Sequence, residues 1–380
     1  MRIVHVSDCY APRTGGIESQ VADLASRQRA AGHEVHVLTA TLGAAGERGG
    51  VVDLEDGVHV HRLGARIPFD LPVNPAGPRL LRDAYAALEP DVVHVHAGLV
   101  SPFAFDGSRL ALERGLPTAI TWHCMLDGVI PALRSAVHRT HWSHPRAALS
   151  AVSAVAAERV RRVFDAPVEI LPNGLDLEAW APDEPVEDVP PADTDADAGP
   201  LRLVATMRLA PRKRAVPLIE LVAAARDRLP RGALRLSLIG SGPAATRVRA
   251  TVARTRLQQV VDLRGRLTRP AVRDAYRDAD VFLAVAELEA FGIAALEART
   301  AGLAVVARRG TGVAEFVEDG VDGLLVADDA EMTEAVVHLA RDRRLLDGIL
   351  AHNRAVRPAF GWTDVLARAE GEYARARSLA

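Results

Sequence analysis

Two glutamates separated by seven residues mark the most informative stretch of the chain. Glu289 precedes an apolar segment and Glu297 lies within it. If this segment forms a helix, the amides of Phe291, Gly292 and Ile293 point out of its first turn, where free N–H groups favour an anion. A carboxylate placed as Glu289 could hold sugar hydroxyls, and Glu297 could bind both hydroxyls of a ribose. The alternative is two surface carboxylates on a capped helix, but apolar residues on both sides of Glu297 argue against a solvated face.

Cationic residues follow another predicted strand. Met207–Lys213 comes directly after an apolar run at Leu201–Thr206, so its side chains would lie at a strand's carboxyl end. Arginine binds a diphosphate through paired hydrogen bonds, and lysine acts as a compact charge. A solvated basic loop is the alternative. It suits Arg212 and Arg214 in a chain with 46 basic residues, but it suits Lys213 less well, because this is the only lysine.

A glycine pair lies in the loop after the first predicted strand. Gly15 and Gly16 separate the strand Arg2–Ser7 from a helical stretch at Gln20–Ala31. Adjacent glycines allow a ligand to approach the backbone, and the helix start offers N–H groups to a phosphate. A flexible turn is the alternative. The Gly-x-Gly-x-x-Gly pattern of dinucleotide-binding enzymes is absent here, which disfavours a nicotinamide cofactor.

Histidines recur at spacings that could bind a metal. His94 and His96 alternate on one predicted strand, and His138, His141 and His144 recur every three residues. No carboxylate or cysteine completes the strand pair, so we interpret it as hydrogen-bonded histidines. A tryptophan and a proline within and after the second set favour an irregular exposed segment there. The sequence therefore predicts no metal site.

The elements that must position these residues alternate between strands and helices. In the N-terminal half the predicted strands are Arg2–Ser7, Glu34–Thr39, Val58–Leu63, Val92–His96, Thr118–Trp122, Leu149–Ser153 and Val168–Leu171. In the C-terminal half they are Leu201–Thr206, Leu234–Ile239, Val260–Leu263, Val281–Val285, Ala304–Ala307 and Gly323–Val326. Helical stretches between them predict parallel sheets, hence an α/β chain with two doubly wound domains facing across a cleft.

Composition excludes several classes of protein. Hydrophobic residues make up 49% and charged residues 25%, which is typical of a globular chain. We expect no membrane-spanning helix and no secretion signal, and therefore a cytoplasmic location. A net charge of −3 does not favour nucleic acid. Cys9 and Cys124 could form a redox pair, but two thiols are the better interpretation.

Taken together, these motifs resemble the retaining glycosyltransferases of family 4, which have the GT-B fold of two Rossmann-like domains. The resemblance covers nearly the whole chain. In order, the similar segments are Gly15-Gly16, Gly32–Val35, Asp91–His96, Thr121–His123, Pro172–Asp176, Arg208 with Lys213, Glu289–Glu297, Gly310–Glu315, Gly320–Leu325 and the helix after Phe360–Trp362.

The resemblance implies a division of the chain. Residues 1–172 would form the acceptor-side domain and residues 201–358 the domain that binds the nucleotide-sugar. Between them, 173–200 would be a junction ending in an acidic, Pro-rich linker at 183–200, which is longer than the family's usual connection. Residues 359–380 would be a helix that crosses back to the first domain.

The resemblance also implies roles. Arg208 and Lys213 would neutralise the donor diphosphate, and Glu297 would bind the ribose. Glu289, with the amides of Phe291, Gly292 and Ile293, would hold the donor sugar. Gly15 and Gly16 would approach the donor phosphate, and His123 would lie beside the sugar and the acceptor. These roles predict a hexosyltransferase.

The reaction implied is transfer of a hexose from a UDP- or GDP-linked donor with retention, through front-side attack. It needs no dedicated metal or other cofactor, because the departing phosphate can take the acceptor's proton. The acceptor is not identified by the sequence and could be a glycan, a lipid-linked molecule or a small molecule. Contact with the inner face of the plasma membrane is left open by the Arg-rich run Glu158–Val163, which could also be a solvated helix.

Two other functions fit parts of the pattern. A nucleotide-sugar epimerase with a similar fold would release products without an acceptor. A non-catalytic nucleotide-sugar-binding protein would need no complete site, so the presence of His123, Lys213 and Glu289 together argues against it.

Overall fold

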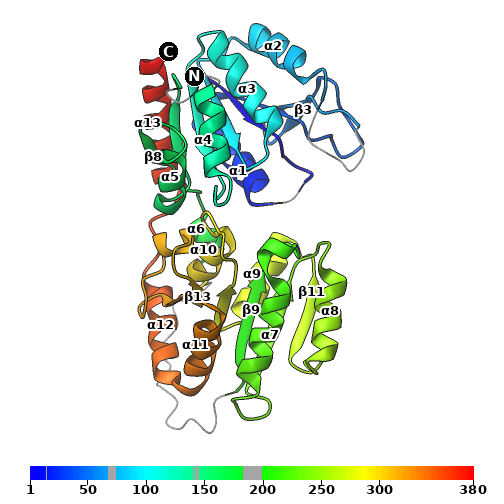
Figure 1. Cartoon of the computed structure of the whole chain (residues 1–380), viewed down its shortest axis with the longest axis vertical. Coiled ribbons are helices and arrows are strands. Elements are labelled where there is room, and N and C mark those ends of the chain that lie inside the picture. Colours follow the sequence, from blue (N-terminus) through cyan, green and yellow to red (C-terminus); the bar gives the residue numbers. More distant parts are fainter. Residues whose placement is uncertain (14, 67–73, 140–141, 143–144, 183–198) are drawn as a thin grey trace. The chain divides into compact units, whose positions relative to one another are not determined.

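The chain divides into two compact units, each with its own predominantly parallel sheet (Figure 1). The computed structural model describes residues 1–13, 15–66, 74–139, 142, 145–182 and 199–380. Unit 1 comprises Met1–Gly174 and Phe360–Ala380, and unit 2 comprises Leu175–Ala359. The expected junction at 173–200 is thus divided between the units after Gly174. Most of its acidic stretch, residues 183–198, lies outside the described residues, as do His141 and His144.

Unit 1 contains an eight-stranded sheet with the order β3-β4-β2-β1-β5-β6-β7-β8. The strands are β1 (Arg2–Ser7), β2 (Glu34–Thr39), β3 (Val51–Glu55), β4 (Val58–Arg62), β5 (Val92–Ala97), β6 (Thr118–Trp122), β7 (Ala148–Ala151) and β8 (Val168–Ile170). Only β3 runs antiparallel, against β4. β3 was not predicted, because Val51, Val52 and Leu54 remain exposed at the sheet edge and the segment lacks the buried face that indicates a strand.

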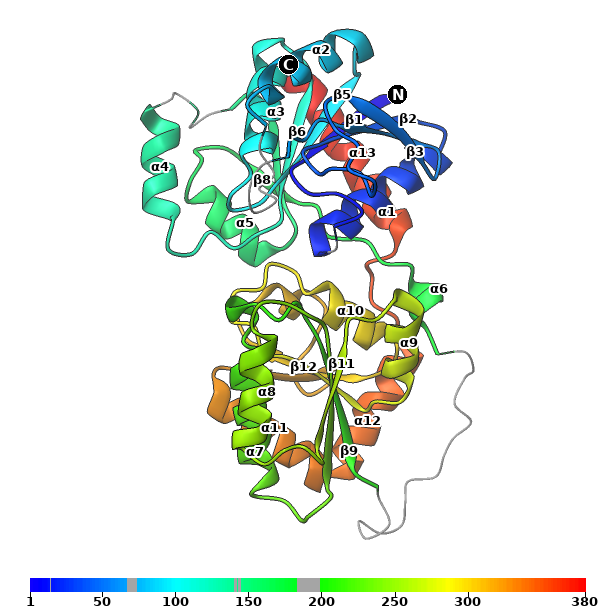
Figure 2. The ribbon, with the colours of Figure 1, turned by 90° about the vertical axis from the view of Figure 1, so that its right-hand side faces the viewer.

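The helices of unit 1 include one from the far end of the chain. They are α1 (Gly16–Ala30), α2 (Gly77–Leu88), α3 (Pro102–Glu113), α4 (Ile130–Arg139), α5 (Ala154–Arg161) and α13 (Trp362–Leu379). Trp362, Val365 and Tyr373 of α13 join the buried cluster formed by strand residues such as Ile3 and Val92. The terminal helix thus packs on the sheet of unit 1 beside α1 (Figure 2).

A glycine fixes the close approach of the Pro-Asn-Gly segment to α13. A Cβ added at Gly174 would lie 2.6 Å from the Trp362 ring. The backbone of Gly174 is also bound on both sides by the Gln20 amide, which donates to its carbonyl and accepts from its N–H at 2.9 Å each. The segment after β8 therefore has little freedom to move away.

We expect Gly174→Ala to lower the free energy of unfolding by about 1–3 kcal/mol, because the added methyl group overpacks this contact. Gly371→Ala is the matched control. Gly371 lies within α13 with nothing within 4 Å of an added Cβ, so this change should add about 0.5–1 kcal/mol. Denaturant unfolding of both variants measures the difference, and equal stabilities would contradict the packing argument.

Unit 2 contains a six-stranded parallel sheet with the order β11-β10-β9-β12-β13-β14. The strands are β9 (Leu201–Thr206), β10 (Leu234–Ile239), β11 (Val261–Gly265), β12 (Val281–Ala284), β13 (Ala304–Arg308) and β14 (Gly323–Val326). The order reverses between β9 and β12. In doubly wound sheets, ligands bind at the carboxyl ends of the strands at this reversal.

Helices cover both faces of this second sheet (Figure 2). They are α6 (Leu177–Trp180), α7 (Ala215–Arg226), α8 (Ala245–Arg254), α9 (Arg269–Arg277), α10 (Ile293–Thr300), α11 (Asp329–Arg341) and α12 (Arg343–Ala355), with the 3-10 turns η2 (Pro211–Lys213) and η3 (Gly312–Glu315). All strands expected in both halves are present, which confirms two Rossmann-like α/β domains.

The structure also bears on the expected absence of a membrane-spanning helix, on the two cysteines and on the Arg-rich run. Among the described residues, no helix combines the length and apolarity needed to cross a bilayer. Cys9 and Cys124 are half-buried and do not form a disulfide. In the Arg-rich run, Arg159 donates to Asp127 at 2.7 and 3.2 Å, so one of its cations is already paired within unit 1.

Candidate functional site

The only lysine contacts a glutamate at the strand-order reversal of unit 2. Lys213 ends η2 after β9, and Glu289 lies in the loop after β12. The Lys213 ammonium donates to Oε2 of Glu289, and the two side chains are 21% and 24% exposed. Because β9 and β12 are neighbours in the sheet, residues 76 positions apart meet at one edge. The pair is partly exposed, so a ligand can reach it.

The start of α10 lies beside this ion pair. Gly292 is its N-cap with φ of +93°, a conformation that favours glycine, and Ile293 is the first helical residue. Phe291 is buried just before the cap. As expected, Gly292 and Ile293 bring backbone N–H groups to the helix start, where intrahelical acceptors are lacking.

A second loop, which follows β13, packs against the backbone just before this helix start. The N–H of Gly312 donates to the Glu289 carbonyl at 2.8 Å. A Cβ at Gly312 would lie 2.1 Å from the carbonyl oxygen of Ala290. The segment after β13, which contains the family-like motif Gly310–Glu315, therefore fixes the backbone that carries Glu289.

Glu297 is not on a solvated face. It lies in α10 and is 9% exposed. Burial, with the negative charge of Glu297, holds the pKa of Tyr276 well above its ordinary value. The Tyr276 hydroxyl donates to the Ala294 carbonyl at 3.4 Å. Glu297 is thus a largely buried carboxylate one helical turn beyond the amides at the start of α10.

Arg208 lies in a loop that is held by a segment the sequence analysis did not select. Its side chain is exposed at the end of β9. The next loop carries Gly240 and Gly242, and added Cβ atoms there would lie 1.8 Å from the Met207 oxygen and 2.6 Å from the Leu209 oxygen. A glycine pair after β10 was the signal that could have identified this support.

The interpretation of Arg214 as part of a solvated basic loop is wrong. Its side chain is 21% exposed and donates to Glu287 at 2.7 Å and to Asp329. Arg308 from β13 shares Asp329 and lies 3.6 Å from Glu287. Arg214 thus forms part of an ion-pair cluster and has no spare charge for a ligand, whereas Arg212 is exposed, as expected.

The glycine pair of unit 1 lies at the start of α1. Gly15 is the N-cap and Gly16 the first helical residue. The φ of Gly15 is −179°, extended backbone that any residue adopts. An added Cβ would lie 2.4 Å from a Glu18 carboxylate oxygen, the end of a flexible side chain. The fold itself therefore gives little reason for glycine at position 15.

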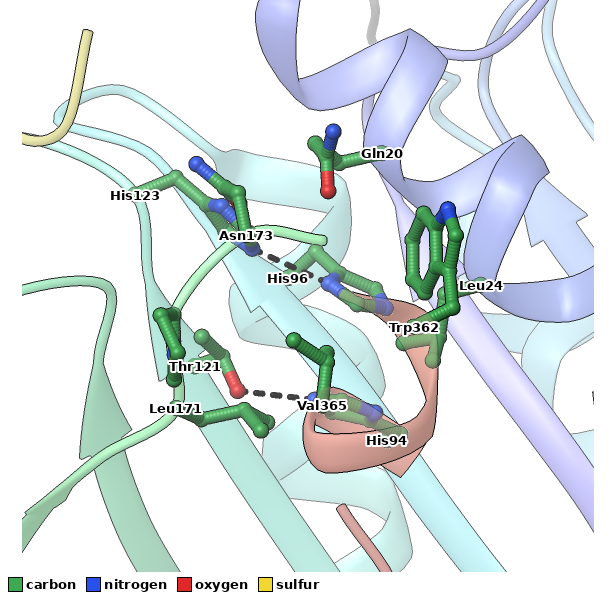
Figure 3. A pocket seen from close by; sticks show the side chains of 11 residues that line it. Gln20, Leu24, His94, His96, Thr121, His123, Leu171, Asn173, Trp362 and Val365 are labelled. Carbon is green, nitrogen blue, oxygen red and sulfur yellow. Dashed lines mark hydrogen bonds between the residues drawn. The ribbon is translucent and has the colours of Figure 1, made fainter. Parts of the chain in front are cut away.

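His123 follows β6 and lines a pocket within unit 1 (Figure 3). The pocket is lined by Gln20, Leu24, His94, His96, Thr121, His123, Leu171, Pro172, Asn173, Trp362 and Val365. Asn173 of the Pro-Asn-Gly segment lies next to His123. Burial lowers the pKa of His123 to about 4, although a hydrogen bond with Asn173 acts in the opposite direction. His123 is therefore neutral at pH 7.

The expected hydrogen-bonded histidines are present, together with a third that the sequence analysis missed. His5 on β1 joins His94 and His96 in a buried group whose candidate ligand atoms lie within 4.8 Å of one another. All ring nitrogens of the three have hydrogen-bond partners within unit 1. A metal would have to displace these bonds.

Asp8 is a further buried group that the sequence did not single out. It follows β1 and accepts the amide N–H groups of Phe103 and Ala104, at 3.0 and 3.2 Å, at the start of α3. Burial raises its pKa to about 6 despite these bonds. Its position, at the order reversal between β1 and β5, was visible in the sequence only as a lone aspartate after a strand.

The buried histidines predict that acid destabilises the protein. Burial lowers the pKa of His5 and His123 to about 4 and holds those of His94 and His96 well below their ordinary value. Below pH 6.5 the unfolded chain takes up protons that the folded chain does not, so stability falls as the pH approaches 4. Asp8 and Glu372, whose pKa values burial raises, act in the opposite direction but are two groups against four. We expect the free energy of unfolding to fall by at least about 2 kcal/mol between pH 7 and pH 5.

Denaturant unfolding at both pH values measures this change. His5→Gln should flatten the pH dependence, since it removes one buried neutral histidine. His338→Gln, at an exposed position of α11, should leave it unaltered. Equal stability of the unmodified chain at pH 7 and pH 5 would refute the argument.

Comparison with known proteins places both units in one family. Residues 14–179 match Glycosyltransferase Family 4, and residues 200–342 match Glycosyl transferases group 1. The D-inositol 3-phosphate glycosyltransferase of Pseudarthrobacter chlorophenolicus is 30% identical over 366 residues, which cover 88% of this chain and 85% of the relative. The GDP-mannose-dependent alpha-mannosyltransferase of Mycobacterium tuberculosis is 26% identical over 367 residues, with 90% and 89% covered.

Solved structures agree on the fold. The structure of Anabaena Alr3699/HepE in complex with UDP-glucose has a TM-score of 0.75 at 19% identity and covers 98% of this chain and 99% of that one. Sucrose-phosphate synthase from Thermosynechococcus elongatus also has a TM-score of 0.75 at 19% identity, with both chains fully covered.

Proposed function

Because the chain belongs to glycosyltransferase family 4 and uses the GT-B fold, we propose that it moves a hexose from a UDP- or GDP-linked sugar to a hydroxyl acceptor with retention of configuration. The observation that carries this proposal is the contact between Lys213 and Glu289 at the carboxyl ends of β9 and β12. The only lysine and a carboxylate meet there beside a helix start, which suits a diphosphate joined to a sugar.

The donor contacts follow from the chemistry of each group. Lys213 and Arg208 would bind the diphosphate, which carries negative charge that increases as the glycosidic bond breaks. The amides of Phe291, Gly292 and Ile293 would add partial positive charge at the start of α10. Glu289 would accept hydrogen bonds from sugar hydroxyls, and the largely buried Glu297 would bind the two ribose hydroxyls.

Donor binding would rearrange the ion pair. With no donor present, Glu289 neutralises Lys213. A diphosphate carries more charge than a carboxylate and would compete for the ammonium, which frees Glu289 to turn to the hexose. The same event would place the lysine at the leaving group and the glutamate at the sugar, so both positions would be set before the bond breaks.

Bond cleavage leaves an oxocarbenium-like sugar, and catalysis is then mostly charge stabilisation and positioning. The departing phosphate oxygen would take the proton of the attacking hydroxyl on the same face, which retains the configuration. We propose that no dedicated metal or other cofactor takes part, since Lys213 and Arg208 supply the positive charge that the leaving group requires.

In unit 1, His123 and the glycine pair Gly15-Gly16 are the proposed contacts to the transferred sugar and the donor phosphate. The acceptor is open, but the names of several relatives contain D-inositol 3-phosphate or phosphatidylinositol. Inositol phosphates and inositol lipids are therefore the first acceptors to test. A cytoplasmic location and peripheral contact with a membrane stay predictions.

Selective acylation of amines tests the proposed donor site, because Lys213 and the N-terminus carry the only primary amines of the chain. We expect UDP-hexose or GDP-hexose to protect Lys213 from a water-soluble acylating reagent and to leave the N-terminal amine equally reactive. Peptide mass spectrometry reads both sites in one sample. Free UDP, GDP and ADP as protectors would rank the bases.

The two amines serve as each other's control. Protection of Lys213 alone by one nucleotide identifies the donor class. If no nucleotide or nucleotide-sugar protects Lys213 at millimolar concentration while the N-terminus reacts normally, the assignment of the diphosphate to this residue is wrong.

A further inference from the structure

A continuous series of hydrogen bonds, buried beyond its first link, leads from His123 into the interior of unit 1. His123 Nε2 lies 3.1 Å from His96 Nδ1, and His96 Nε2 lies 2.9 Å from His5 Nδ1. His5 Nε2 lies 2.7 Å from Oε1 of Gln28 on α1. Figure 3 shows the contact between His123 and His96 at the pocket end of this series.

The series of hydrogen bonds continues on the other side of the Gln28 amide. Its amide nitrogen donates to the Tyr373 hydroxyl on α13 at 2.7 Å. The Tyr373 hydroxyl oxygen lies 2.9 Å from Nδ1 of His94, and Nε2 of His94 lies 2.8 Å from the Thr121 hydroxyl oxygen. Every member between Gln28 and Thr121 is at most 3% exposed, so water does not compete for these bonds.

Each contact between two ring nitrogens holds one proton, because a hydrogen bond needs one donor and one acceptor. If His96 carries its proton on Nε2, then Nδ1 of His5 must accept, so His5 also carries its proton on Nε2. Nδ1 of His96 must then accept from Nε2 of His123. The opposite arrangement inverts all three rings together. His5, His96 and His123 therefore share one tautomer.

Gln28 joins this set to His94. With its oxygen towards His5, the amide accepts from Nε2 of His5 and donates to Tyr373, which then donates to Nδ1 of His94. His94 then carries its proton on Nε2, like the other three. Rotating the amide by half a turn reverses every bond. The orientation of a single amide is thus linked to the tautomers of four histidines.

We propose that Gln28 and Tyr373 are positioning residues for His123: through His5 and His96 they determine whether the second ring nitrogen of His123, Nδ1, is a hydrogen-bond donor or an acceptor. The consequence for sugar binding rests on the proposed function of His123, but the coupling itself does not. It assigns a role to the terminal helix α13, which holds the amide of α1 through Tyr373.

Neutrality of the rings supports the coupling. Burial keeps the pKa of His5 and His123 near 4 and those of His94 and His96 well below their ordinary value. A charged imidazole would donate from both nitrogens and break the alternation of donor and acceptor. Asp8 and Glu372 are the buried acids of unit 1 whose pKa values are raised, and neither is hydrogen-bonded to these rings.

Nitrogen-15 NMR of the full chain at pH 7.5 tests the inference without any donor or acceptor, because imidazole nitrogens with and without a proton resonate far apart. We expect His5, His94, His96 and His123 to show one common tautomer. Different tautomers among His5, His96 and His123 would overturn the proposal. A stoichiometric metal ion bound to His5, His94 and His96, detected by elemental analysis, would also overturn it. Metal ligation would use the ring-nitrogen lone pairs that accept the hydrogen bonds between these residues.

Two variants test the direction of control. Tyr373→Phe removes the hydroxyl that orients Gln28, and we expect His123 to lose its single tautomer, giving two populations or the inverted form. In a His96→Phe background, which interrupts the chain of bonds, Tyr373→Phe should no longer alter the His123 signals. An unchanged His123 tautomer in folded Tyr373→Phe protein would contradict the proposal. Because sugar transfer is not measured, this result is independent of whether the proposed function holds.

Discussion

Replacing Lys213 with alanine is expected to lower the rate of sugar transfer by about 10²–10³-fold, the cost of removing one preorganised charge from a developing anion. Lys213 is the only lysine and contacts Glu289 at the strand-order reversal of unit 2. Loss of the ammonium removes the positive charge closest to that carboxylate, so the diphosphate would meet Glu289 uncompensated. Steady-state kinetics with saturating acceptor measure the effect.

Arg212→Ala is the matched control. Arg212 lies in the same 3-10 turn, carries the same charge and is exposed. It should leave kcat/KM within about twofold. Equal losses in both variants would mean that the general charge of the loop matters and that Lys213 has no special role. Full activity of Lys213→Ala would contradict the proposed site.

Replacing Glu297 with glutamine is expected to weaken nucleotide binding by about 10–100-fold. Hydrogen bonds to a charged group contribute about 1.5–3 kcal/mol, and each 1.4 kcal/mol is a factor of ten in affinity. Glu297 is 9% exposed, so few waters compete with a bound ribose. Glutamine keeps the shape and removes the charge. Isothermal titration with the nucleoside diphosphate that protects Lys213 measures the loss.

The 2′-deoxy nucleotide provides the internal control for Glu297. The unmodified chain should bind it more weakly than the ribonucleotide, and Glu297→Gln should bind both with similar affinity. Glu318→Gln, an exposed position of the same unit, should behave like the unmodified chain. If Glu297→Gln still distinguishes the two nucleotides to the full extent, then another group binds the ribose.

The sequence predicted the elements whose signal is local. Most parallel strands are short apolar runs followed by a helix, so both doubly wound sheets were predictable. The chain positions of Lys213 and Glu289 after two strands implied the same sheet edge, which the order β9-β12 confirms. Burial of Glu297 also followed from the apolar residues around it.

The remaining features depend on contacts between distant residues. The edge strand β3 buries little, so no periodic pattern indicated it. The hydrogen bond between Gln28 and Tyr373 joins residues 345 positions apart, and single polar residues on two helices carry no signal of such a pairing. Arg214 looked like one arginine among many until Glu287 and Asp329 were placed beside it.

The most direct test of the central claim is proton NMR of the purified chain with an α-linked nucleotide-hexose, with and without an inositol-containing acceptor. We expect nucleoside diphosphate to be released only when acceptor is present, and the first product formed to carry an α-anomeric proton. Release of nucleotide with an isomerised sugar in the absence of acceptor would indicate an epimerase. A β-linked first product would contradict retention and the front-side geometry proposed for Lys213 and Glu289.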